Sequence, residues 1–211
     1  MQTDERAKPA RPESRHRRAV STPLDNWLRA VVATPGLTAL SLDRARSVLL
    51  EDSLRAVELV RANDGPVVDV GSGGGAPGIP LAYVLPEREV VLLEAERRKC
   101  DFLERWAPPN ARVVWGRAEE QPTGWAGVAT AKALATPPVA VEWCLPLLRV
   151  GGVAILWVGE TADLDAVAAA AGLLGAELED SESGLLVLRK TSPTPAGFPR
   201  RTGVAKKRPL V

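Results

Sequence analysis

The sequence contains very few disulfide-forming or metal-binding side chains and no long apolar run. Its 211 residues include two cysteines and one histidine, and both Cys100 and Cys144 stand in helix-like sequence. Two such thiols make neither a disulfide framework nor a metal cluster, so we expect them to be small core residues. No apolar stretch approaches the roughly 20 residues of a bilayer-spanning helix, and Met1–Arg6 lacks an apolar signal segment. We therefore expect a cytoplasmic protein that uses no metal and contacts no membrane.

The charges are unevenly distributed along the chain, although the formal net charge is only +1. Residues 1–20 hold six basic and three acidic side chains, whereas residues 189–211 hold seven basic side chains and no acidic one. The remaining 14 basic and 23 acidic residues make residues 21–188 acidic. A basic C-terminal arm on an acidic globule indicates a polyanionic partner, because Lys and Arg gain affinity by displacing phosphate counterions. The alternative is a solvated tail that only keeps the protein soluble.

The length and the 45% hydrophobic content fit one α/β core with tails. Residues 1–20, which are polar and contain proline, are predicted to form a disordered basic tail. Apolar residues recur at helical spacing from Leu24 to Arg61, which predicts a cap of two or three helices over residues 21–64. Residues 65–191 would form the core and residues 192–211 the basic arm. We expect the protein to be a monomer.

Predicted strands and helices alternate after Gly65. The strands fall at 66–70, 89–94, 111–115, about 125–131 and 152–158, and the helices at 77–84, 95–106, 137–148 and 162–173. This alternation predicts an α/β fold with a mostly parallel, doubly wound sheet. Two further strands, about 175–181 and 184–190, are separated by a short turn, so the last strand should be antiparallel at the end of the sheet. A dinucleotide-binding domain does not need such a strand.

A glycine-rich loop follows the first predicted strand. It reads Asp69-Val-Gly71-Ser-Gly73-Gly-Gly75-Ala-Pro77-Gly, with a helix predicted immediately after it. Glycine permits positive φ and places no Cβ between the backbone and a ligand. The helix start offers unpaired N–H groups, and proline suits its first turn. The loop therefore predicts a site at which a cofactor touches the backbone.

The loop is compatible with more than one cofactor. Its glycines also satisfy the dinucleotide fingerprint, as Gly73-x-Gly75-x-x-Gly78. Asp69, two residues before Gly71, completes the pattern D-x-G-x-G-x-G, which is typical of methyltransferases that use S-adenosylmethionine (SAM). That carboxylate could hold the amides of the loop or face the ammonium group of the ligand. SAM is favoured, while NAD and a turn without any ligand remain alternatives.

Three other strand ends carry candidate site residues. Glu94 ends the second strand, where its carboxylate could accept hydrogen bonds from ribose hydroxyls in either kind of site. Ala118 and Glu119 follow the third strand and would border an adenine, unless they merely form an acid-rich helix start. Lys132 ends the fourth strand, where it would attract phosphate or substrate charge or simply be a surface lysine.

Five motifs together resemble one family of enzymes. They are D-V-G-S-G-x-G-x-P-G-I-P-L-A, L-L-E-x-x-x-R-(R/K)-x-x-F-L, G-R-A-E-E, E-W-C-L-P-L-L-x-x-G-G and F-P-R-R-x-G-x-x-x-K-x-P-L. The chain from about Leu24 to Leu210 is thereby similar to the bacterial small-subunit (16S) ribosomal RNA guanine-N7 methyltransferases, the glucose-inhibited division protein B family. The resemblance implies a Rossmann-like SAM-dependent methyltransferase fold with an N-terminal helical extension.

The resemblance also implies roles for individual residues. The SAM site would lie at Gly71, Gly73, Gly75 and Ala76, with Glu94 at the ribose and Ala118 and Glu119 at the adenine. The partner would be 16S ribosomal RNA or the small ribosomal subunit. The RNA-binding candidates are the clustered cations of the arm. Pro199 and Pro209 discourage helix, so the arm is predicted to be extended. The alternative is that Phe198 and Leu210 pin it to the fold. These candidates are Arg200, Arg201, Lys206 and Lys207.

The chain departs from the family at three positions. Lys132 stands where the family usually has Arg, Leu49 where it has His, and Val158 where it has Lys. A degenerate SAM-binding or RNA-binding protein without turnover is therefore one alternative, and an NAD-dependent oxidoreductase is another. Guanine N7 carries a lone pair and no proton, so methyl transfer to it needs alignment rather than a general base. Accordingly no catalytic side chain is assigned. Lys132 is counted among the cofactor-binding candidates and is also a candidate for positioning the substrate.

Overall fold

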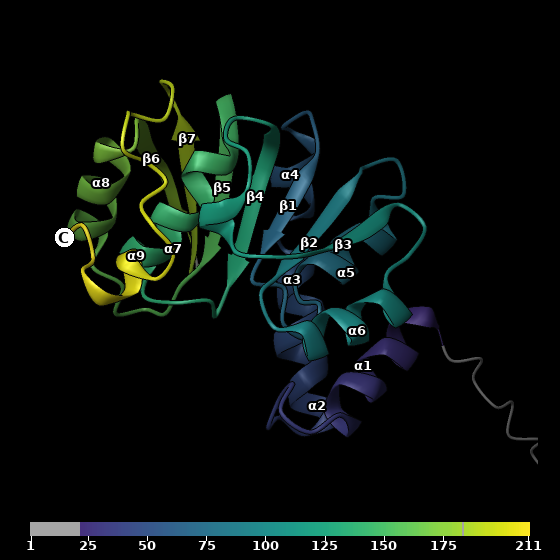
Figure 1. The fold of residues 1–211 in the computed structure, drawn as a ribbon. Helices are drawn as coiled ribbons and strands as arrows, with labels where there is room; N and C mark the ends of the chain where they lie inside the picture. Colours follow the sequence, from purple (N-terminus) through teal and green to yellow (C-terminus); the bar gives the residue numbers. More distant parts are fainter. Residues whose placement is uncertain (1–21, 183) are drawn as a thin grey trace, which may run out of the picture.

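A computed structural model describes residues 22–182 and 184–211 of the chain, so the predicted tail at residues 1–20 lies outside the described residues. Within them the strands form one seven-stranded sheet in the order β3-β2-β1-β4-β5-β7-β6 (Figure 1). The strand bounds are β1 Val67–Val70, β2 Val90–Glu94, β3 Ala111–Trp115, β4 Ala126–Lys132, β5 Leu148–Trp157, β6 Ala176–Glu182 and β7 Leu185–Lys190.

The pairing of the strands confirms the predicted fold class. β1 pairs in parallel with β2 on one side and with β4 on the other. The parallel sheet continues outward, because β3 pairs in parallel with β2 and β5 pairs in parallel with β4. β7 is antiparallel to both β5 and β6. The last strand of the chain is thus the antiparallel one, as predicted, but it lies one place in from the edge because the hairpin inserts it between β5 and β6.

Helices cover both faces of the sheet. Their bounds are α1 Pro23–Ala33, α2 Leu42–Ala45, α3 Asp52–Leu54, α4 Val57–Arg61, α5 Gly78–Val84, α6 Arg97–Trp106, α7 Pro137–Cys144, α8 Leu164–Leu173 and α9 Val204–Lys207. A π-helical turn, η1 Arg46–Glu51, joins α2 to α3, and short 3₁₀ turns occur at η2 Ala118–Glu120 and η3 Leu145–Leu147.

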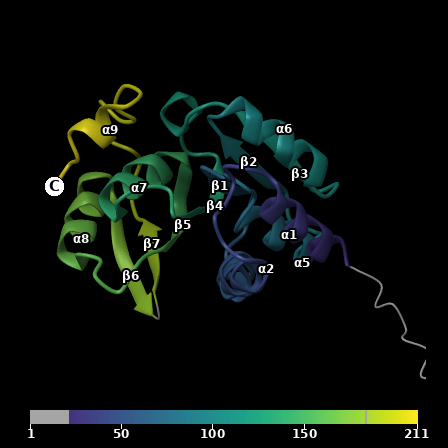
Figure 2. The same cartoon turned by 90° about the horizontal axis from the view of Figure 1, so that it is seen from below.

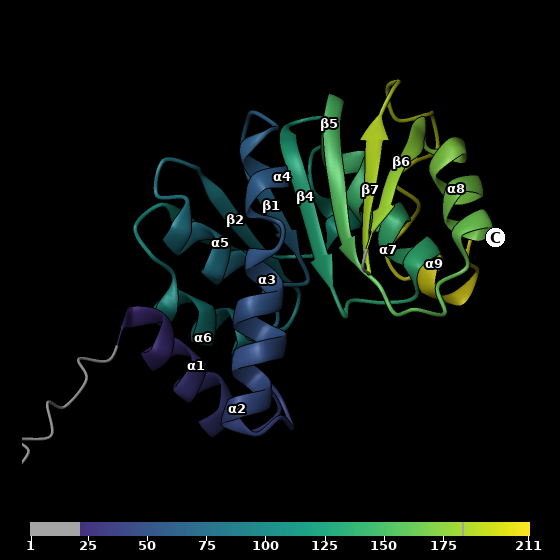
Figure 3. The same cartoon turned by 180° about the vertical axis from the view of Figure 1, so that it is seen from behind.

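The two faces bury separate sets of side chains. α1, α4, α5 and α6 pack on one face with Val67 of β1, whereas α7 and α8 pack on the other with Val68 and Val70 (Figures 2 and 3). Successive side chains of a strand point to opposite faces, and a parallel sheet covered on both sides needs apolar residues throughout. This explains why β1 and β2 read as almost continuous apolar runs. Cys100 and Cys144 are buried, as expected.

The N-terminal helices are fixed to the glycine loop. Thr22 and Asp25 form a capping box that starts α1, and the side chain of Trp27 is completely buried. The indole Nε1–H of Trp27 donates to the carbonyl oxygen of Gly74 at 2.9 Å. The helical cap thereby reaches the loop that follows β1.

Four predicted helix bounds differ from the structure: α5, α6 and α8 begin one or two residues later than predicted, and α7 ends earlier. The helix predicted at 137–148 ends at Cys144, because Pro146 has no N–H to continue it, and β5 already begins at Leu148. Pro77 precedes α5 as its N-cap residue instead of lying in the first turn. No helix in the described ranges is both long and apolar enough to span a membrane.

The prediction that the C-terminal arm is extended is wrong. The segment after β7 folds back over α7, and residues 204–207 form the short helix α9 in spite of the neighbouring prolines (Figure 1). Ala205 is buried, and Phe198 and Leu210 pack against the core on the α7 and α8 face. The alternative considered above, in which these two apolar residues pin the segment to the fold, describes its structure.

Candidate functional site

A cavity of about 540 Å³ opens at the carboxyl ends of the central strands. β1 lies between β2 and β4, so the order of the strands along the chain reverses direction at β1. Ligands of open α/β sheets bind at the carboxyl ends of the strands at such a switch point, and the cavity lies there. Its wall comprises loop residues 71–74 and 76, residues 94–96 at the end of β2, residues 116–119 after β3 and residues 132–134 at the end of β4. Apolar residues of the helical cap, including Leu37 and Leu49, also line it.

The three glycines predicted to bind a cofactor differ in what surrounds them. All have positive φ, at +70° for Gly71, +57° for Gly73 and +104° for Gly75. A Cβ at Gly71 would lie 2.2 Å from Leu134 Cδ1, and one at Gly75 would lie 2.5 Å from Ile79 Cδ1. A Cβ at Gly73 would meet nothing nearer than 3.8 Å. Gly73 therefore leaves open space in the cavity, whereas Gly75 does not line it and serves close packing.

Asp69 supports the loop from below. Its side chain is buried, Oδ2 accepts from the Gly78 N–H at 3.2 Å, and Oδ1 accepts from the Thr130 hydroxyl at 3.0 Å. Burial raises the pKa of this carboxyl to about 6, although the hydrogen bonds that it accepts oppose the shift. Of the two roles considered for Asp69, holding the loop amides is the one observed, since the residue does not line the cavity.

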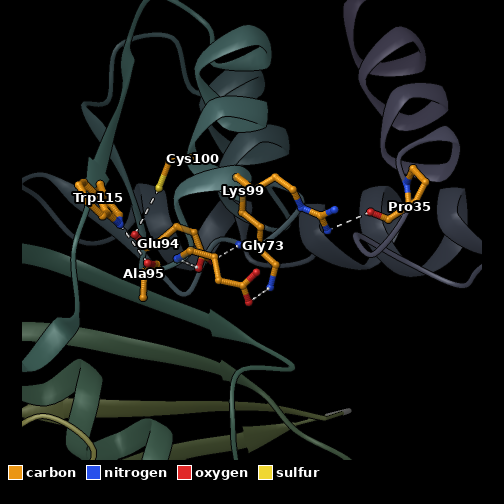
Figure 4. A network of polar contacts seen from close by, with 9 residues as sticks. Pro35, Gly73, Glu94, Ala95, Lys99, Cys100 and Trp115 are labelled. Carbon is orange, nitrogen blue, oxygen red and sulfur yellow. Dashed lines mark hydrogen bonds and ion pairs between the residues drawn. The ribbon is translucent and has the colours of Figure 1, made fainter.

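Glu94 ties the end of β2 to the glycine loop (Figure 4). Oε2 accepts from the Gly73 N–H at 2.9 Å, and Oε1 accepts from the Glu96 N–H at 2.8 Å. Its carboxylate is largely buried yet lines the cavity. Because each carboxylate oxygen can accept more than one hydrogen bond, both oxygens keep acceptor capacity. The sequence pointed to a ligand contact here but missed the contact with the loop.

Ala118 and Glu119 lie together on the wall formed by η2. Ala118 is nearly buried, whereas Glu119 is half-buried and reaches the cavity. One carboxylate oxygen of Glu119, Oε1, accepts from the backbone N–H of Gly203 at 3.0 Å. The C-terminal arm thus touches the cavity wall, a contact that the sequence did not predict.

Lys132 is paired with an acid of the helical cap. Its ammonium forms an ion pair with Asp52 and lies 5.2 Å from the ring centre of Trp157, whose indole N–H donates to the backbone oxygen of Asp52 at 3.1 Å. Burial lowers the pKa of Lys132, although the hydrogen bond to Asp52 raises it. Any substrate anion at Lys132 must therefore compete with Asp52.

Two departures from the family pattern occupy different places. Leu49 lines the cavity, so an apolar side chain stands there where the resemblance leads us to expect histidine. Val158 packs against the core and is not a lining residue. Among the described residues, no group of three or more His, Cys, Asp or Glu side chains is arranged to hold a metal ion.

The basic candidates in the arm divide into two groups. The guanidinium of Arg200 is bound to the carboxylate of Glu142, which is only 2% exposed, and also donates to the Arg208 carbonyl at 2.9 Å. Arg200 is thus a structural anchor in this fold. Arg201, Lys206 and Lys207 are exposed, and their role stays a prediction.

The fold and the cavity define the class of protein. A sheet with this antiparallel β7 and a glycine loop at the switch point belongs to the Rossmann-like methyltransferase fold. A SAM-dependent O-methyltransferase from Thermotoga maritima matches with a TM-score of 0.54 and 15% identity, covering 69% of this chain and 66% of that one. The antibiotic-resistance methyltransferase Kmr matches with a TM-score of 0.50 and 19% identity, over 67% and 91% of the two chains.

Sequence comparisons define the family. Residues 36–182 match the family described as GidB: rRNA small subunit methyltransferase G. The ribosomal RNA small subunit methyltransferase G of Rubrobacter xylanophilus is 41% identical, covering 80% of this chain and 71% of the relative. Its counterpart in Synechococcus elongatus is 36% identical over 76% of each chain. The chain therefore belongs to the GidB family of ribosomal RNA methyltransferases.

Proposed function

We propose that this protein transfers the methyl group of SAM to N7 of a guanine in 16S ribosomal RNA. The observation that carries the proposal is the glycine-loop cavity in a chain of the GidB family. The curated relatives are named as ribosomal RNA small subunit methyltransferases, which supports the substrate class. The expectations of a monomer that acts in the cytoplasm belong to this proposal.

The residues of the cavity fit SAM as the methyl donor. The open space at Gly73 would let the ligand approach the backbone, and the unused acceptor capacity of Glu94 suits ribose hydroxyls. Ala118 and Glu119 would face the adenine from the opposite wall. Gly71 and Ala76 complete the loop surface, whereas Asp69 and Gly75 would act indirectly by fixing its shape.

The chemistry needs alignment more than acid–base catalysis. In the transfer, a bond forms between guanine N7 and the methyl carbon while the bond between that carbon and sulfur breaks, and S-adenosylhomocysteine leaves as a neutral thioether. No proton moves, so no general base is required. The apolar cap residues Leu37, Leu40 and Leu49 would exclude water from the reacting atoms. Lys132 would position the acceptor by its charge.

The RNA would be bound partly through the exposed cations of the arm. Arg201, Lys206 and Lys207 stand on a segment held against the methyltransferase core, so phosphate contacts there would fix the RNA relative to the cavity. Arg200 is left out of this set because it is bound to Glu142.

Two alternatives are separated from the proposal by binding and by turnover. Leu49 in the cavity favours a protein that binds SAM or RNA without transferring the methyl group, and the second glycine fingerprint favours an NAD enzyme. Calorimetry with SAM, S-adenosylhomocysteine and NAD distinguishes an NAD enzyme from the other two possibilities. We expect micromolar binding of the first two ligands, whereas binding of NAD alone would refute the proposed cofactor.

Turnover is tested by transfer of labelled methyl from SAM to 16S ribosomal RNA from a strain that lacks this modification. Naked RNA and assembled small subunits are supplied in parallel. Incorporation into either supports an active enzyme. Binding of SAM without incorporation into either substrate would favour the degenerate alternative.

A further inference from the structure

The C-terminal arm is attached to the wall of the cavity at η2. The Gly203 N–H donates to Glu119 Oε1 at 3.0 Å, and the Thr202 hydroxyl donates to Glu120 Oε1 at 2.9 Å. Two consecutive residues of the arm therefore hold two consecutive carboxylates. Only Glu119 of these two lines the cavity.

A second attachment fixes the arm to α7. Arg200 binds the carboxylate of Glu142, and the next residue on that helix, Trp143, also lines the cavity. Because Glu142 is 2% exposed, removal of Arg200 would leave a buried charge without its partner. The arm is thus attached to two elements that each contribute a lining residue to the cavity, η2 through Glu119 and α7 through Trp143.

The hydrogen bond from Gly203 restricts the orientation of the Glu119 carboxylate. A free glutamate side chain has three rotatable bonds, and fixing it before a ligand arrives lowers the entropic cost of binding. In the described part of the chain, Oε2 of Glu119 receives no hydrogen bond, so this oxygen can accept one from a donor in the cavity. The exocyclic amino group of adenine is a donor of this kind.

We propose that residues 200–203 of the arm position Glu119 to accept a hydrogen bond from the exocyclic amino group of the adenine of SAM. The arm would then be a part of the cofactor site that determines its preference for adenine, in addition to any contact with RNA. This inference rests on the proposed use of SAM. Arg200 and Gly203 are positioning residues, because they act through Glu142 and Glu119 and neither of them lines the cavity.

The test compares two ligands by calorimetry. They are S-adenosylhomocysteine and its analogue with purine in place of adenine, which lacks only the exocyclic amino group. We expect the wild-type protein to bind the first roughly tenfold or more tightly, the size expected for a hydrogen bond to a charged group. Arg200→Glu places two carboxylates together and should detach the arm, which should reduce this preference to about twofold or less.

Three further variants control for folding and charge. Arg200→Glu combined with Glu142→Arg restores the ion pair with its polarity reversed and should restore the preference for adenine. Arg112→Glu breaks an exposed pair with Glu89 at the beginning of β3, at the opposite end of the strand from the cavity, and should leave the preference unchanged. Glu142→Gln keeps the shape of the buried side chain and weakens its bond to Arg200, so it should lose part of the preference even if Arg200→Glu does not fold.

The possible results are distinguishable. If a folded Arg200→Glu protein binds both ligands more weakly by the same factor, the inference is overturned, because the arm then supports the fold without affecting the preference for adenine. The proposed use of SAM would not be affected by that result. If Arg200→Glu does not fold, an unchanged preference in folded Glu142→Gln would do the same. Failure of the wild-type protein to bind S-adenosylhomocysteine would overturn the proposed function and the inference together.

Discussion

Replacing Gly73 by alanine isolates the role of the glycine loop in ligand binding. The φ of Gly73 is +57°, and the new Cβ would be 3.8 Å from the nearest atom, the carbonyl oxygen of Gly71. The change thus costs only the left-handed conformation of an alanine, about 1 to 2 kcal/mol. For a protein of this length, that corresponds to a fall in Tm of roughly 2 to 8 °C. The fold should survive.

The same methyl group would occupy space that the ligand needs. We expect the affinity of Gly73→Ala for S-adenosylhomocysteine, measured by calorimetry, to fall at least about tenfold, equivalent to about 1.4 kcal/mol. Gly71→Ala is a poorer test, since its Cβ would lie 2.2 Å from Leu134 Cδ1 and would disturb the fold itself.

A matched control separates backbone strain from ligand contact. Gly124 is exposed in a turn before β4, has a φ of +72°, and its Cβ would meet nothing within 4 Å. Gly124→Ala should lower the Tm by a similar amount and leave the dissociation constant unchanged. The reasoning is refuted if Gly73→Ala binds as tightly as the wild type, or if both variants lose the same affinity.

Three other perturbations have defined outcomes. Burial lowers the pKa of Lys190 to about 8, so between pH 8 and 10.5 the folded state binds fewer protons than the unfolded state and stability rises with pH. Lys190→Met should raise the free energy of unfolding at pH 7 by up to about 3 kcal/mol, less the cost of leaving the Leu174 carbonyl without the hydrogen bond that Lys190 donates to it. The variant should also abolish that slope in urea denaturation, and an unchanged slope would contradict this. Lys132→Met should lower kcat/KM for RNA methylation by roughly tenfold, with a much smaller change in the affinity for S-adenosylhomocysteine. If kcat/KM and the affinity for S-adenosylhomocysteine fall by the same factor, Lys132 lies at the cofactor instead of the acceptor. Changing Arg201, Lys206 and Lys207 together to Gln should flatten the salt dependence of RNA binding by about 0.7 to 0.9 log units for each phosphate that the protein no longer neutralises, and an unaltered slope would remove the arm from RNA binding.

The strands and the glycine loop could be predicted because their signals are local. A buried parallel strand needs a continuous apolar run, and a loop with positive φ needs glycine, so each is visible within a few residues. The same locality explains the errors at helix ends. Pro146 lies inside the pattern of apolar residues from which the helix at 137–148 was predicted, yet its missing N–H ends regular α-helix at Cys144.

The contacts that the sequence did not reveal join segments that are distant along the chain. Asp52 and Lys132 are 80 positions apart, and Glu119 and Gly203 are 84 apart. In the sequence, the positive charge of Arg200 indicated a contact with RNA. The structure shows that this charge is instead paired with Glu142, which the fold buries. Glu94 was recognised as a site residue from its place at a strand end, but its bond to Gly73 required the loop to be seen in space.

The central claim is the identity of the methylated atom. The direct measurement is mass spectrometry of nucleosides from 16S ribosomal RNA, or from small subunits, after incubation with this protein and SAM. We expect 7-methylguanosine to approach one molecule per RNA molecule, with no other new methylated nucleoside. A methyl group on any other base or on ribose, or no methylation of either substrate by a protein that binds SAM, would contradict the proposed function.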